Sequence, residues 1–161
     1  MTTYGCPWQV EPFITIGIQK QVFKRFVDMS QILPSGQFAV LLGSPAFSKN
    51  LELSGRFMVA YLRGVRDYVD TFTFGKADEE IYRILTKHTD LKEADHWRRV
   101  NVPGLNPNGY FFKEDVRRQI QWYKENGYYE GTLDIDEVTD YASVDFALQV
   151  LGRYRYPIDI R

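Results

Sequence analysis

Residues 50–72 read NLELSGRFMVAYLRGVRDYVDTF, and this stretch decides how the rest of the chain is divided. Asn50 has a side chain that can cap the first turn of a helix. Apolar and aromatic residues then recur every three or four positions, at Phe57, Tyr61, Val65, Tyr68 and Phe72, with Arg63, Arg66, Asp67 and Asp70 on the other side. The spacing predicts an amphipathic helix that begins after Asn50 and ends before Gly75.

The chain after this helix keeps a helical spacing. Gly127 and Gly152 are placed to end two later helices, and Asp134 with Glu137 forms an acidic variant of the capping box. The loop at 102–109 contains two turn signals. We therefore expect helices over about 78–88, 92–99, 113–126 and 134–151.

The chain before residue 48 has a different pattern. Pro12 can begin a short helix that reaches about Gln21. Residues 23–29 (FKRFVDM) and 37–42 (QFAVLL) predict strands, with a turn signal between them at 34–36. The second run is almost wholly apolar, which is typical of a strand buried on both faces of a sheet. The sequence therefore predicts an α/β fold with a few strands followed by about five helices.

Composition restricts the function. The 161 residues carry a net charge of -1 and no basic patch, which argues against a nucleic-acid-binding protein. No apolar run approaches the roughly 18 residues of a membrane span. The first residues lack the layout of a signal peptide. The single cysteine, Cys6, excludes an internal disulfide and a zinc site made of several cysteines.

Several stretches together resemble one family, the solute-binding proteins of ABC importers of the nitrate, sulfonate, taurine and thiamine-pyrimidine-precursor type. The match covers nearly the whole chain but about half of a family member. Its most specific part is RFMVAYLRGVRDY at 56–68. The other stretches, in order, are WQVEPF at 8–13, QFAVLL at 37–42, SPAF at 44–47, PGLNPNG at 103–109, QWY at 121–123, VDFAL at 144–148 and LG at 151–152.

The resemblance implies a fragment of a two-lobe periplasmic-binding-protein (type II) fold, in which solute lies between the lobes. Residues 1–35 resemble the end of the second lobe. Residues 36–161 resemble the crossover strand and C-terminal helices of the first lobe, packing with the rest as one domain. The implied protein is a truncated C-terminal half that works in the periplasm, delivers a small solute to an ABC permease, and needs no cofactor.

Three residues are candidates for ligand binding. Trp8 offers a stacking face, and Glu11 offers a carboxylate to an amine or ring N–H of a flat heterocycle such as a pyrimidine. By analogy with the crossover segment, Gln37 is the third. The alternative is that Trp8 belongs to the core and Glu11 only stabilises the start of a helix.

The other reactive residues point to structural roles. His88 and His96 lack partners at ligand spacing, and Cys6 has no activating neighbour in the sequence. The acidic run does not fit a calcium loop, and the paired arginines are expected on solvated faces. The run and the pairs are Asp134, Asp136, Glu137 and Asp140, then Arg98–Arg99 and Arg117–Arg118. We expect no catalytic residue and no metal ligand.

Two other classes of protein stay open. One is an enzyme fragment similar to the fungal thiamine-pyrimidine synthases, which rely on a histidine and clustered cysteines. The other is a scaffold fragment that binds no small molecule. In either case the apolar run at 37–42 needs cover, so we expect a homo-oligomer with residues 1–47 at the interface or exchanged across it.

Overall fold

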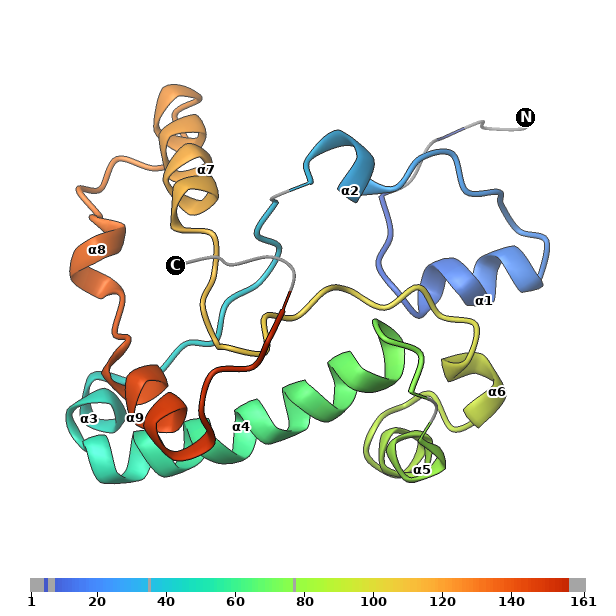
Figure 1. Cartoon of the computed structure of the whole chain (residues 1–161). Helices are drawn as coiled ribbons and strands as arrows, with labels where there is room; N and C mark the ends of the chain where they lie inside the picture. The colour runs from blue at the N-terminus through green and yellow to red at the C-terminus, as the bar shows by residue number, and fades with distance from the viewer. Residues whose placement is uncertain (1–4, 6–7, 35, 77, 157–161) are drawn as a thin grey trace. The chain divides into compact units, whose positions relative to one another are not determined.

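A computed structural model of the chain describes residue 5 and residues 8–34, 36–76 and 78–156 (Figure 1). Helix makes up 53% of the described chain. The helices in these residues are α1 (Phe13–Gln19), α2 (Met29–Ile32), α3 (Pro45–Lys49), α4 (Leu51–Phe72), α5 (Glu79–His88), α6 (Ala94–Trp97), α7 (Lys113–Glu125), α8 (Ile135–Val138) and α9 (Ala142–Leu151).

The predicted α/β fold is wrong, because the described residues contain no strand or sheet. The first predicted strand, at 23–29, is irregular chain that leads into α2, and the second, at 37–42, is irregular chain that leads to α3. A strand exists only where a second strand completes its ladder of backbone hydrogen bonds. Neither stretch has such a neighbour in the described chain, so their β-like composition does not produce a sheet. The expected fragment of a two-lobe fold with a few strands is therefore replaced by a small helical protein.

Helix α4 begins as predicted, but its buried face matches the predicted one only in part, because Val65 is buried whereas Phe57 and Tyr61 are not. The Asn50 side chain accepts a hydrogen bond from the Leu53 amide (3.2 Å). The aromatic residues Phe57 and Tyr61, which were expected to lie inward, are 44% and 37% exposed. The most buried positions of the helix are Ser54, Leu62, Val65 and Val69. The buried face of α4 therefore begins at the small side chain of Ser54 and leaves Phe57 and Tyr61 partly exposed.

The last predicted helix is divided into α8 and α9. The Thr139 hydroxyl donates to the Ile135 carbonyl (2.5 Å), and the Asp140 carboxylate accepts from the Ala142 amide (2.8 Å). Short polar side chains that bond nearby backbone compete with helix continuation in this way. Asp134 caps α8 through the Asp136 amide (2.9 Å), so the predicted cap is present on a shorter helix.

The described chain forms two compact units, each made from two separate stretches. Unit 1 comprises Met1–Asp28 and Tyr68–Gly104, and unit 2 comprises Met29–Asp67 and Leu105–Arg161. Helix α4 contributes to both, because the division falls after Asp67. In the part of the chain that the structure describes, no helix is long and apolar enough to cross a membrane.

Unit 1 is organised around aromatic rings. The Phe72 ring lies 5.9 Å from the Tyr82 ring and 6.3 Å from the Trp97 ring, between centroids. The Trp97 indole donates to the Leu91 carbonyl (3.0 Å), so its polar atom is satisfied beside the apolar contacts. The buried residues of this unit, within the described chain, are Thr15, Gly17, Val69, Thr71, Tyr82, Leu91 and Val100.

Unit 2 is built on a close approach of α4 and α9. The hydroxyls of Ser54 and Ser143 lie 2.9 Å apart in the buried contact between the two helices. Gly109 has a φ of +81°, and a Cβ there would lie 3.2 Å from Val144 and 3.3 Å from Leu62. Only glycine combines that backbone conformation with so little space. The loop at 103–109 is thereby held against the core.

Candidate functional site

Trp8 is the most accessible of the three predicted ligand residues. It lies in unit 1, a few residues before α1, and its side chain is 63% exposed. The alternative that Trp8 belongs to the core does not agree with this exposure. An exposed indole offers a broad apolar face on which a planar molecule can stack.

Glu11 lies in the same unit and is engaged by other groups of the protein. One carboxylate oxygen accepts from the Thr15 amide (3.0 Å), and the other accepts from the Arg25 guanidinium (3.1 Å). Its side chain is 8% exposed. Glu11 thus stabilises the first turn of α1 and joins it to the chain at Arg25. The pairing of Arg25 with Glu11 could not be predicted, because Arg25 lies inside a predicted strand.

Gln37 belongs to unit 2 and joins the irregular segment after α2 to the start of α7. Its amide donates to the Asp115 carboxylate (2.6 Å), and its side-chain oxygen accepts from the Phe112 amide (3.0 Å). Its side-chain nitrogen donates to the Ala39 carbonyl (2.5 Å), and its own carbonyl accepts from the Gln119 amide group (2.8 Å). These bonds hold the segment in place and use both ends of the Gln37 side chain.

Asp115 is the buried charge of unit 2, with only 3% of its side chain exposed. It accepts from the Gln37 amide, from Arg118 (2.6 Å) and from Gln119 (2.7 Å). Burial raises the pKa of Asp115, but the hydrogen bonds from Gln37, Gln119 and Arg118 outweigh it and hold the pKa below its usual value. The role of Asp115 was not predicted from the sequence. An aspartate in the first turn of a helix is common because it interacts favourably with the helix dipole, so its position alone does not indicate a buried contact.

Arg66 is a second residue that joins distant segments, and the sequence did not indicate this role. Its guanidinium donates to the backbone carbonyls of Pro107 (3.2 Å), Leu151 (3.3 Å) and Gly152 (2.6 Å). Burial lowers the pKa of Arg66 from its ordinary value. The residue was expected on the solvated side of its helix, whereas it joins α4 to the 103–109 loop and to the end of α9.

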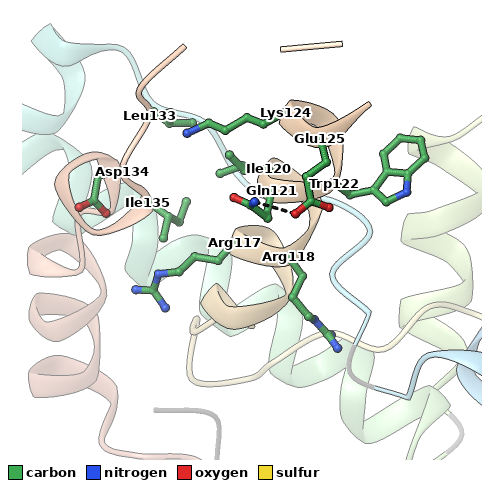
Figure 2. Close-up of a pocket in the computed structure, with 10 residues that line it drawn as sticks. All are labelled: Arg117, Arg118, Ile120, Gln121, Trp122, Lys124, Glu125, Leu133, Asp134 and Ile135. Carbon is green, nitrogen blue, oxygen red and sulfur yellow. Dashed lines mark hydrogen bonds between the residues drawn. The ribbon is translucent and has the colours of Figure 1, made fainter. Parts of the chain in front are cut away.

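A recess lies in unit 2 between α7 and the chain that enters α8, with a volume of about 660 Å³ (Figure 2). Ile120, Leu133 and Ile135 give it apolar walls, and Lys124 extends toward Leu133. Figure 2 also shows Gln121 bonded to Glu125 (2.8 Å) and Trp122 pointing away from Ile135. The recess is an open groove of the volume that small ligands occupy, and its charged lining residues are Arg117, Arg118, Lys124, Glu125 and Asp134.

The remaining polar candidates have structural partners or lie at the surface. His88 ends α5, and His96 lies 3.7 Å from Glu93. Arg98 pairs with Glu79 and Asp95 (both 2.7 Å), and Arg117 pairs with Glu114 and Asp136. The pairing with Lys113 and Arg117 lowers the pKa of Asp136. Cys6 lies outside the described residues, and within those residues no group of three His, Cys, Asp or Glu side chains could hold a metal ion.

The motifs quoted for the family resemblance can now be placed on the structure. The 56–68 stretch lies in α4, the 103–109 stretch is the loop against unit 2, and 144–148 lies in α9. Comparisons with protein-family models, with curated proteins and with solved structures found no match to this chain. A function is therefore inferred from these motifs and from the contacts of their residues.

Proposed function

We propose that this chain is part of a solute-binding protein of an ABC importer, and that it binds a small solute without catalysing a reaction. The solute comes from the nitrate, sulfonate, taurine or thiamine-pyrimidine-precursor class. The proposed partner is an ABC permease in the membrane facing the periplasm. A second copy of the chain is the other proposed partner.

The observation that carries the proposal is that hydrogen bonds join three of the quoted motifs, those at 56–68, 103–109 and 151–152. Arg66, from the 56–68 motif, bonds Pro107 of the 103–109 motif and both residues of the 151–152 motif. Gln37, at the start of the 37–42 motif, bonds Asp115 and Phe112. Unrelated short matches have no reason to be joined by hydrogen bonds between segments that lie far apart in the sequence. These contacts support a shared structural role for the motifs, which is what the resemblance implies.

The proposed ligand contact is the exposed face of Trp8. Glu11, three residues after Trp8 in the sequence, is already paired with Arg25 (3.1 Å), so the proposed preference comes from the indole more than from charge. A planar heterocycle gains from stacking on an indole, whereas nitrate and small sulfonates offer no comparable apolar face. A pyrimidine is therefore the favoured solute.

A thermal-shift screen of the purified chain against a pyrimidine, taurine, an alkanesulfonate and nitrate tests the proposal. Specific binding to the folded state must raise the unfolding temperature. We expect the pyrimidine to give the largest rise and Trp8→Ala to abolish it. Trp122→Ala is the matched control, because Trp122 is 53% exposed and lies on α7.

Two outcomes contradict the proposal. If none of the four solutes raises the unfolding temperature, the chain does not bind this class of solute. If Lys124→Ala or Trp122→Ala abolishes the rise while Trp8→Ala does not, the ligand occupies the groove at α7 and the assignment of Trp8 is wrong.

A further inference from the structure

The segment from Phe38 to Leu42, here called the apolar segment, lies open in the described chain. Phe38 is 72% exposed, Val40 44%, Leu41 53% and Leu42 87%. It connects α2 to α3 as irregular chain (Figure 1). Its ends are fixed, by the Gln37 hydrogen bonds to α7 on one side and by the Ser44 cap of α3 on the other. Apolar side chains on a segment that is held in place at both ends indicate a surface that another chain covers.

The two backbone edges of the apolar segment differ. Successive residues of an extended chain direct their N–H and C=O groups to opposite edges. The amide and carbonyl of Gln37 bond α7, and the Ala39 carbonyl accepts from the Gln37 side chain, so the odd-numbered edge is directed toward α7. Within the described residues, the amides and carbonyls of Phe38, Val40 and Leu42 have no hydrogen-bond partner, and on the odd-numbered edge only Gln37 and the Ala39 carbonyl have one. The even-numbered edge is thus available.

No charge protects this edge. Residues 29–48 contain no Asp, Glu, Lys, Arg or His. Proteins that keep an open edge from pairing usually place lysine or another charged residue on it. The lack of charge also means that two copies of the segment can approach each other without electrostatic repulsion.

We propose that the apolar segment pairs edge to edge with the same segment of a second copy of the chain. Antiparallel pairing through the even-numbered edge places Val40 on the twofold axis, opposite Val40 of the second copy, and Phe38 opposite Leu42. In each pair, the amide of one residue then donates to the carbonyl of the other and the reverse. These backbone groups have no hydrogen-bond partner within a single chain. The pairing is isologous, so it closes at a dimer.

This inference deepens the self-association proposed above and is independent of solute binding. Mass is measured by light scattering at micromolar concentration, whereas solute binding is measured by thermal shift, so either result can fail without the other. We expect a dimer for the chain as it stands. Val40→Lys should weaken dimerisation at least about tenfold, because two lysines then face each other across the axis. Val138→Lys is the matched control, because Val138 is 58% exposed on α8.

Crosslinking tests the register. In a background with Cys6→Ser, Val40→Cys should form a disulfide-linked dimer under mild oxidation, because opposed residues lie within the Cα separation that a disulfide spans. Val138→Cys should form no disulfide-linked dimer under the same conditions. Far-UV circular dichroism checks that each variant keeps its helix. A stable monomer, a dimer that Val40→Lys does not weaken, or equal crosslinking at both cysteines overturns the proposal. Pairing with a different polypeptide in place of a second copy would also overturn it.

Discussion

At the scale of single residues, this protein is held together by side chains that bond the backbone of distant segments. Asp115 receives the Gln37 amide across 78 positions of sequence, and Arg66 reaches Leu151 across 85. In each of these bonds a charged side chain holds together two segments that are far apart in the sequence. The same side chain makes further hydrogen bonds to other groups of the protein. A charged group of this kind is costly to remove, because its partners are left buried and unpaired.

Asp115→Asn should lower the free energy of unfolding by about 1–3 kcal/mol, since it weakens a charge-assisted cluster that has little solvent to replace it. Urea denaturation at pH 7 measures the loss. Asp136→Asn is the control, because that side chain is 53% exposed and its ion pairs are solvated; its effect should be clearly smaller than that of Asp115→Asn. Equal losses in the two variants would show that the burial of Asp115 has no energetic importance.

The same carboxylate should make stability depend on pH. The pKa of Asp115 is lower in the folded protein than in the unfolded chain, where it is about 3.9. Its contribution is therefore complete above the unfolded value and is lost as the pH falls through the folded value. The difference in unfolding free energy between the wild type and Asp115→Asn should shrink below about pH 4. A difference that stayed constant from pH 7 to pH 2 would contradict the assigned cause.

Arg66→Met should lower the free energy of unfolding by about 2 kcal/mol, because three backbone carbonyls lose their donor. Arg66→Lys should not restore the loss, since a single ammonium cannot reproduce the planar fork that contacts separate carbonyls. Arg63→Met, at an exposed position of the same helix, is the control and should change stability by less than about 0.5 kcal/mol. If Arg66→Lys is as stable as the wild type, charge alone explains the role of Arg66.

At the scale of elements, the helices could be predicted where local signals agree. Asn50 as a cap and the spacing of apolar residues fixed the start and length of α4. The inward face could not be predicted, because it depends on which helix packs against α4. Gly55 and Ser54 let α9 approach closely, and that contact outweighs the larger aromatic surface of Phe57 and Tyr61. The spacing of apolar residues indicates a helix, but it does not indicate which other helix packs against it.

Two glycines of α4 give a matched test of this packing. A Cβ at Gly55 would lie 2.6 Å from the Phe146 ring, whereas a Cβ at Gly64 would meet nothing within 4 Å. Gly64→Ala should stabilise the protein by about 0.5–1 kcal/mol through helix propensity. Gly55→Ala should destabilise it by about 1–3 kcal/mol, because the ring must move in a packed contact. Thermal denaturation of both variants measures the contrast, and stabilisation by both would show that α9 does not pack closely at Gly55.

At the scale of the whole molecule, the sequence misjudged the fold class for a physical reason. The run at 37–42 has the composition of a buried strand, but a strand is a property of two segments and not of one. The helical half of the expectation held because helices satisfy their own backbone. The same distinction between local and distant contacts applies to the candidate site. The exposure of Trp8 agrees with a ligand contact, whereas the bonds of Glu11 and Gln37 depend on residues distant in sequence, which no local pattern indicates.

Calorimetric titration of the chain with a pyrimidine tests the central claim, that this protein binds a small solute on the face of Trp8. The account predicts saturable binding at one site per chain, an affinity at least about tenfold weaker in Trp8→Ala, and no change in Trp122→Ala, since one stacked ring pair accounts for an effect of that size. The absence of saturable heat with any solute of the proposed class, or equal binding by the wild type and Trp8→Ala, would contradict it.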